Sequence, residues 1–191
     1  MTLLVGLAAA SGCQRLIAPG APQPRADDEV FGAAATHVAA DEGWEVRVDP
    51  RLMDSVRTAF DPALDSGAAP MPHFARDARV EQARARTLDR AGIPHGHMDA
   101  FVACTAYIGG IPTDSAAADP DFSARRRECL DRHARTAVAS LGRARMLGDG
   151  RWSIRVYVLT PVSRAVYDLL LARADDGWNV DGRQSLLDVT M

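Results

Sequence analysis

Three apolar runs near the C-terminus, separated by turn residues, constrain the fold of this chain more than any other feature. In residues 152–158, apolar side chains alternate with Ser, Arg and Tyr, and a period of two is typical of a half-buried strand. Turn residues precede this run at 148–150 and separate the later runs at 160–161 and 175–177. Glycine-containing turns between apolar runs indicate antiparallel hairpins. We therefore predict a β-meander of three or four strands that reaches about Val189.

The N-terminal half of the chain is predicted to supply a helix that packs on this sheet. Asp27 or Asp28 can cap a helix that runs to about Ala40 with apolar residues on one face. Residues 44–49 then alternate between apolar and charged side chains until Pro50. This alternation predicts a short, half-buried strand.

The middle of the chain is predicted to be mainly helix and loop. Apolar residues in 52–60 have helical spacing and predict a short helix, and residues 61–73 are rich in Pro and Gly and predict a loop. Residues 74–91 are rich in Arg and Ala and are followed by helix stop signals, so we expect a surface helix. Residues 123–133 also have a helical pattern, whereas residues 134–147 are compatible with helix or strand.

These patterns together predict the α+β class, with N-terminal helices packed on a C-terminal antiparallel β-meander. A chain of 191 residues with 47% hydrophobic and 25% charged residues has the composition of one globular domain. We place this single domain at residues 27–191. A helix on a curved sheet is also the outline of cystatin-like and NTF2-like folds, an architectural analogy that does not define a function.

The charge pattern excludes some classes of function. The net charge is −3, and the longest basic run is Arg125 to Arg127, most simply a solvated helix face, so no nucleic-acid partner is expected. Every basic residue other than His is Arg. The absence of Lys rules out Schiff-base catalysis by Lys and the phosphate-binding Lys of a P-loop.

The first residues of the chain have the pattern of an export signal. The apolar run Leu3 to Ala10 is far shorter than the roughly 20 residues that span a bilayer as a helix, but it suits the apolar region of a signal peptide. It leads into Ala10-Ser11-Gly12-Cys13. This segment resembles the lipobox of bacterial prolipoproteins at three of four positions, with Ala10 where Leu is usual.

The resemblance implies a signal peptide at residues 1–12, lipidation of Cys13, and a lipid-anchored protein of the bacterial cell envelope. Residues 13–26 are rich in Pro and Ala and have the composition of a tether. The expected contact with the membrane is through the lipid anchor, and the expected partner is another envelope protein or a cell-wall component. The alternative is that residues 1–26 form a cytosolic N-terminal helix with a chance cysteine.

Lipidation of Cys13 would leave Cys104 and Cys129 as an even pair in an oxidising compartment, where we expect them to form a disulfide. Closing this loop would stabilise the fold by roughly 3 kcal/mol in the chain-entropy model. The alternatives are two buried free thiols, or a catalytic Cys129 assisted by His133 four residues later.

The sharpest candidate for chemistry is His95-Gly96-His97-Met98-Asp99. It resembles the His-x-His-x-Asp core of the metallo-β-lactamase superfamily, in which imidazoles and a carboxylate hold metal ions against a water nucleophile. The next His of that pattern is replaced by Ala100. His95, His97 and Asp99 are therefore metal candidates, with a solvated loop or an adventitious two-His site as the alternatives.

No other residue is assigned a catalytic role, and no cofactor is expected. His37 and His73 are expected to be satisfied or exposed. The three tryptophans, each at the start of a predicted strand, are expected to pack in the core or at the rim of the sheet: Trp44, Trp152 and Trp178.

Three functional hypotheses follow. The first is a non-enzymatic envelope lipoprotein with a binding or structural domain, and it predicts a surface patch or groove without clustered titratable groups. The second is an NTF2-like binder of small ligands, or a cofactor-free enzyme, with an apolar pocket between helix and sheet. The third is a metal-dependent hydrolase in which His95, His97 and Asp99 converge.

Overall fold

The computed structural model describes residues 24–40, 43–56, 71–108 and 120–190. The predicted signal peptide, Cys13 and most of the predicted tether lie outside these ranges. In chain order the elements are α1 (Pro24–Ala39), β1 (Glu45–Asp49), β2 (Met53–Val56), β3 (Pro72–Phe74), α2 (Ala78–Ala91), α3 (Asp99–Ile108), α5 (Phe122–His133), β4 (Thr136–Leu141), β5 (Arg145–Met146), β6 (Trp152–Leu159), β7 (Ser163–Ala174) and β8 (Gly177–Thr190).

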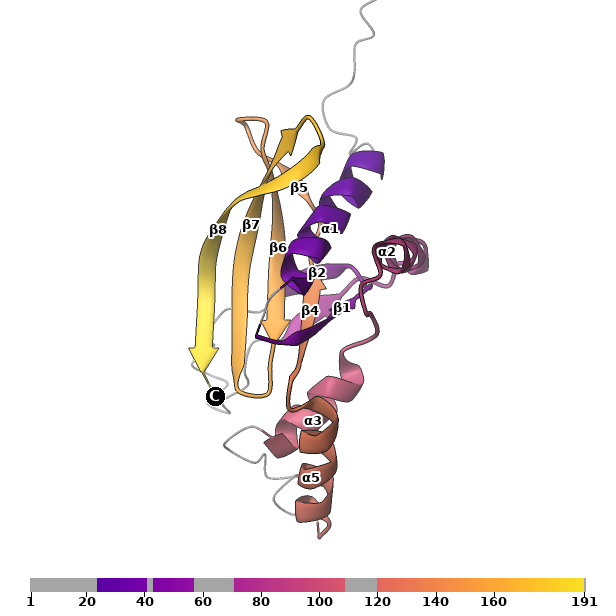
Figure 1. The fold of residues 1–191 in the computed structure, drawn as a ribbon, viewed down its shortest axis with the longest axis vertical. Helices are drawn as coiled ribbons and strands as arrows, with labels where there is room; N and C mark the ends of the chain where they lie inside the picture. The colour runs from indigo at the N-terminus through magenta and orange to yellow at the C-terminus, as the bar shows by residue number, and fades with distance from the viewer. Residues whose placement is uncertain (1–23, 41–42, 57–70, 109–119, 191) are drawn as a thin grey trace, which may run out of the picture.

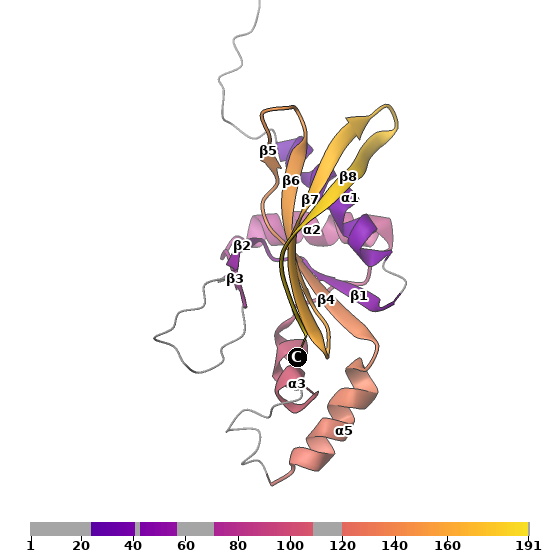
Figure 2. The ribbon, with the colours of Figure 1, turned by 90° about the vertical axis from the view of Figure 1, so that its left-hand side faces the viewer.

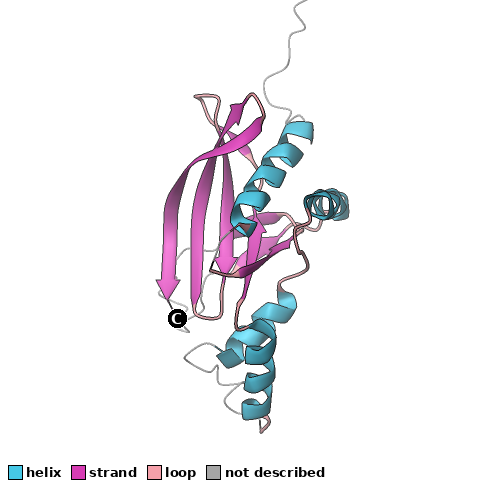
Figure 3. Cartoon of the chain, viewed as in Figure 1, coloured by secondary structure: helices cyan, strands magenta, loops and turns pink. Residues whose placement is uncertain are grey.

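The domain is α+β, as predicted, with helices followed by a C-terminal sheet (Figures 1 and 3). In the described residues the main sheet has the order β1-β4-β6-β7-β8, and β5 pairs with β6. The meander β6-β7-β8 is antiparallel throughout, whereas β1 joins β4 in parallel. The predicted hairpin at 175–177 is confirmed, since Ala174 pairs with Gly177. Gly177 has φ +142°, a value that residues with a side chain rarely adopt.

One face of the sheet carries the main core. Helix α1 lies across this face (Figures 1 and 2) and buries the stripe Val30, Phe31, Ala34, Ala35 and Val38. These side chains pack against inward-facing residues of the strands, such as Val48, Ile154 and Leu169, all of which are fully buried. Alternation along the strands and the helical stripe of α1 together produce this core.

The opposite face carries a second, smaller cluster. The hairpin β2-β3 lies on this side (Figure 2). The buried members of the cluster are Met53, Met98, Phe101, Val138, Tyr157, Leu159 and Val166. Because β4 is covered on both faces, all six of its residues are buried.

The two edges of the sheet are protected in different ways. At β1, the segment after Pro94 continues the sheet: Val48 N–H donates to the carbonyl of Pro94 at 3.0 Å, and Gly96 N–H donates to that of Val48 at 3.2 Å. At β8, the register with β7 shifts twice, which leaves Asp181 and Leu186 outside the paired register. Bulges of this kind discourage further strands from pairing with an edge.

The predictions for residues 52–60 and 61–73 need correction. The predicted helix at 52–60 is wrong in its described part, because Met53–Val56 is strand β2 and pairs with β3. The predicted loop at 61–73 likewise ends in β3; residues 57–70 lie outside the described ranges. A segment this short cannot sustain a helix by itself, so pairing with β3 decides its conformation.

The predicted helix at 74–91 starts later, at Ala78. Asp77 caps it by accepting hydrogen bonds from the backbone N–H groups of Arg79 and Val80, and Gly92 ends it in the left-handed conformation at φ +67°. Helix α1 starts earlier than predicted, at Pro24, so residues 24–26 belong to the helix rather than to the tether.

Helix α5 confirms the helical prediction for 123–133, and β4 decides the open question at 136–141 in favour of a strand. Helix α3 was not predicted. It packs beside α5 at the end of the molecule farthest from the start of α1 (Figure 1). None of the helices in the described ranges is both long and apolar enough to cross a membrane.

Candidate functional site

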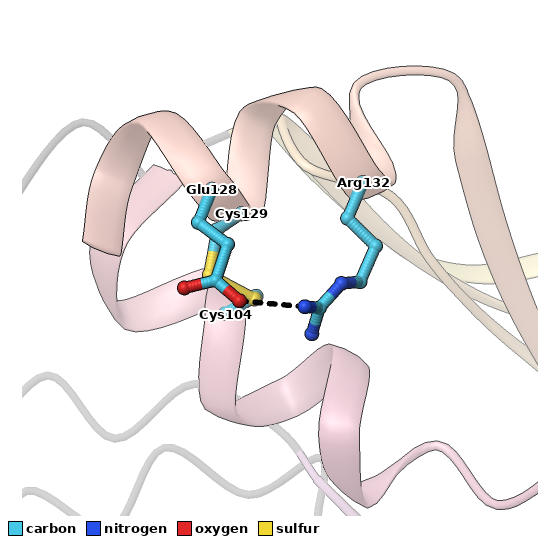
Figure 4. The surroundings of a disulfide bond; sticks show 4 residues. All are labelled: Cys104, Glu128, Cys129 and Arg132. Atoms are coloured by element: carbon cyan, nitrogen blue, oxygen red, sulfur yellow. Dashed lines mark hydrogen bonds and ion pairs between the residues drawn. A yellow bond between two sulfur atoms is a disulfide. The ribbon is translucent and has the colours of Figure 1, made fainter. Parts of the chain in front are cut away.

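The helices α3 and α5 are joined by the predicted disulfide. Cys104 and Cys129 are bonded, with a Cα–Cα distance of 5.4 Å, and both residues are buried. On the outer surface of α5, Arg132 donates to the carboxylate of Glu128 at 2.6 Å (Figure 4). The sulfurs are thus covered by the helix pair.

His133 lies one turn beyond Cys129 and is only 8% exposed. Its ring meets the edge of Phe101 on α3 with 5.2 Å between ring centroids. Neither ring nitrogen has a hydrogen-bond partner in the part of the chain that the structure describes. Burial lowers the pKa of His133 below its ordinary value, and the positive charges of Arg132 and Arg47 add to this effect.

The three metal candidates do not share a site. His95 Nε2 lies 2.9 Å from Asp89 Oδ1, and His97 Nε2 lies 2.8 Å from Glu81 Oε1. Both carboxylates are on α2, where a separation of eight residues corresponds to about 12 Å of helix. Asp99 instead pairs with Arg51. Within the described ranges, no group of three or more His, Cys, Asp or Glu side chains could hold a metal ion.

Asp49 and Arg51 form a polar cluster at the end of β1. The Asp49 side chain is fully buried and accepts from Arg51 Nη2 at 2.7 Å and from the backbone N–H of Met98 at 2.9 Å. Arg51 also donates to Asp99 at 3.1 Å and stacks over the ring of Phe74 at 4.0 Å. The hydrogen bond to Asp49 is the main reason that the pKa of Arg51 is raised; burial opposes it, and Asp99 adds to it.

Arg84 is a second buried cation and is only 2% exposed. It donates to the carbonyls of Leu141 and Gly142, both at 2.7 Å, and its guanidinium lies 4.3 Å from the ring centroid of Phe31. Burial lowers the pKa of Arg84 to about 10, although the charges of Asp27 and Asp28 oppose this change. Arg84 therefore joins α2 to the end of β4 and to α1.

This role of Arg84 is absent from the predictions above, although the sequence carries a signal for it. Arg84 lies four residues from both Val80 and Leu88, so helical spacing places it on the apolar face of α2. The prediction of a simple surface helix is therefore incomplete, since α2 buries both Arg84 and Leu88.

Arg164 on β7 is a third cation with buried atoms. Its Nε and Nη1 are buried without a hydrogen-bond partner in the described part of the chain. Its charge acts on the neighbouring Tyr157, whose pKa is raised by burial to about 12 against the effect of Arg164. The Tyr157 hydroxyl donates to the sulfur of Met71 at 3.8 Å.

The other histidines, the arginine run and the tryptophans discussed in the sequence are structural or exposed. His37 and His73 are exposed, and so is the run Arg125 to Arg127. The three tryptophans pack against the main core, as predicted. Trp152 and Trp178 meet edge to face at 6.0 Å, and Trp178 donates to Glu29 on α1 at 3.2 Å.

The described surface includes an open hollow along α5, lined by Ala124, Arg127, Glu128, Asp131 and Arg132. By contrast, the described interface between α1 and the sheet is filled by apolar side chains. Four of the five residues lining the hollow are charged, and α5 lies at the end of the molecule far from the start of α1 (Figure 1).

No family model, curated protein or solved structure matches this chain. The cystatin-like or NTF2-like outline therefore stays a prediction, while the α+β class and the disulfide rest on the structure itself.

Proposed function

We propose that this protein is an envelope lipoprotein anchored through Cys13, and that its domain is a non-enzymatic binding or structural module. The observation that carries the proposal is the disulfide between Cys104 and Cys129. Structural disulfides persist in oxidising compartments and are rare in the cytosol. The pair therefore supports export, which the lipobox-type start of the chain also predicts.

The geometry favours a binding surface over the other two hypotheses, an NTF2-like ligand binder or enzyme and a metal-dependent hydrolase. An NTF2-like ligand binder predicts a pocket between helix and sheet, and apolar side chains fill that space in the described residues. A metal-dependent hydrolase predicts that His95, His97 and Asp99 converge, and each pairs with a different residue. An open, charged surface such as that of α5 suits a polar macromolecular partner better than a small apolar ligand.

The arrangement of the domain supports the same proposal. Helix α1 begins at one end of the molecule, and α3 and α5 lie at the other (Figure 1). A lipid anchor on the N-terminal side of α1 would place the disulfide-linked helices away from the membrane, towards envelope proteins or the cell wall. We propose these as the partners, without nucleic acid.

The decisive test is the intact mass of the protein extracted in detergent from membranes of its native host. We expect a chain that begins at Cys13, carries acyl groups, and is about 2 Da lighter because of the disulfide. A Cys13→Ala variant is the matched control and should leave the membrane fraction. An unlipidated chain beginning at Met1 would overturn the proposal.

A second experiment addresses the binding role. The purified protein is sedimented with isolated cell-wall sacculi, with Arg127→Ala and Arg132→Ala as variants on α5. Cosedimentation that falls in these variants supports a cell-wall partner. Absence of cosedimentation would exclude the cell wall and leave an envelope protein.

A further inference from the structure

His133 occupies an environment that suits a neutral ring and penalises a charged one. The residue is 8% exposed, and the described chain offers no hydrogen-bond partner to either ring nitrogen. Its nearest ring neighbour is Phe101, which approaches edge to face at 5.2 Å. A neutral imidazole tolerates this apolar contact, whereas an imidazolium would lose hydration without gaining an acceptor.

The charged groups around His133 reinforce this preference. Arg132 on α5 and Arg47 on β1 both oppose a second positive charge at His133. Strand β4 carries no titratable side chain.

The acidic groups nearby do not compensate for these arginines. Among the described side chains of α3, Cys104 is in the disulfide and the carboxylate of Asp99 is paired with Arg51. Glu45 and Asp49 are the carboxylates of β1; Glu45 is exposed, and Asp49 is paired with Arg51. The carbonyl end of α5 favours a cation, but burial and the two arginines outweigh it, so that the pKa of His133 is lowered.

The position of His133 makes this preference structurally important. It is the last residue of α5, one turn beyond the disulfide and three residues before β4 begins. The disulfide keeps α3 and α5 connected whatever the state of the ring. Loss of the contact with Phe101 would therefore free the end of α5 without separating the two helices.

We propose that His133 is a pH-sensitive latch, which holds the C-terminal end of α5 against Phe101 when its ring is neutral and releases it when the ring is protonated. Well above pH 6.5, the ordinary pKa of histidine, both the closed and the open state are neutral and the latch is fully stable. As the pH falls below that value, the open state takes up a proton before the closed state does. The closed state therefore loses stability as the pH falls from about 6.5 through the lower pKa of the closed form.

The test is hydrogen exchange at the amides of α5 in the full chain, measured from pH 7.5 to pH 4.5 and corrected for the intrinsic exchange rate. The opening equilibrium of the wild type should rise in acid, by tenfold for each unit that separates the two pKa values. In His133→Gln this rise should disappear, and in the matched control His37→Gln, at an exposed position on α1, it should persist.

Two further measurements keep the proposal falsifiable if His133→Gln folds poorly. His133→Phe retains a ring against Phe101 and should also abolish the acid response. The ring titration followed by NMR in the wild type requires no variant, and its midpoint should lie below 6.5. A midpoint at or above 6.5, or an acid response that survives in His133→Phe, would overturn the latch. The acid response of α5 does not depend on lipidation of Cys13. A failure of the latch can therefore be distinguished from a failure of the proposed anchoring.

Discussion

Asp49 and Arg51, two residues apart, form an ion pair of 2.7 Å in which the Asp49 side chain is fully buried. The same carboxylate accepts from the backbone N–H of Met98, the residue immediately before α3. One side chain thus joins the end of β1, the entry to β2 and the segment that leads into α3. Arg51 extends this link to the ring of Phe74 on β3.

Replacing Asp49 by Asn is expected to lower the free energy of unfolding by about 3 kcal/mol, because the largely buried guanidinium of Arg51 loses its buried partner and keeps only the exposed Asp99. Urea denaturation measures the change. Asp99→Asn is the matched control: Asp99 also pairs with Arg51, but its side chain is 68% exposed, so a loss below about 1 kcal/mol is expected. Equal losses in the two variants would contradict a special role for the buried carboxylate.

Arg84→Met should destabilise the protein by about 2–4 kcal/mol, since it leaves two buried carbonyl groups without a donor. Thermal and urea unfolding measure this loss. Arg86→Met lies on the same helix at an exposed position and should change stability by less than about 0.5 kcal/mol. If the two variants unfold alike, the contacts of Arg84 with Leu141 and Gly142 contribute nothing to stability.

Reduction of the disulfide should lower the free energy of unfolding by about 3 kcal/mol, because the bond closes a loop with a sequence separation of 25. The measurement is the melting temperature with and without a reducing agent. The double variant Cys104→Ser with Cys129→Ser should melt at the temperature of the reduced wild type and should not respond to the reductant. The prediction would be contradicted if reduction of the bond in the wild type, shown independently, left the melting temperature unchanged.

Arg164→Met is expected to raise the free energy of unfolding by about 1 kcal/mol or more, because buried polar atoms without a partner carry an uncompensated desolvation cost. Urea denaturation is again the measurement, and Arg145→Met, at an exposed position on β5, is the control. Destabilisation by Arg164→Met would show that the guanidinium makes a favourable interaction in solution.

Metal removal is expected to leave the melting temperature unchanged, because His95 and His97 already have separate carboxylate partners on α2. The test compares the protein after chelation with the protein after addition of zinc. A melting temperature that rises on addition of zinc would revive the metal-site hypothesis, provided that the double variant His95→Ala with His97→Ala shows no such rise.

Much of the C-terminal sheet could be predicted because its signals are local. Alternation in 152–158 and the turn residues at 175–177 specify strand, face and hairpin within a few neighbouring positions. The capped end of α2 at Gly92 is likewise a local signal. These features need no knowledge of the rest of the chain.

The candidate site could be predicted only in part. With Cys13 assigned to lipid, the sequence predicts that Cys104 pairs with Cys129, and the structure confirms their bond. Closeness in sequence suggests one site for His95, His97 and Asp99. Their partners are instead three separate residues: Asp89, Glu81 and Arg51. Sequence spacing alone cannot reveal which distant carboxylate or guanidinium will neutralise a polar side chain.

The sequence by itself therefore determined the α+β class, the strand alternation and the C-terminal ends of α1, α2 and α5, since these depend on periodicity and backbone preference over a few residues. Only the tertiary structure decided that 53–56 pairs as a strand, that Arg84 is buried, and that His133 faces Phe101 without a polar partner in the described chain. The physical reason is that burial and pairing depend on contacts between residues far apart in sequence. A local pattern indicates which face of an element is apolar, but not what the fold places against it.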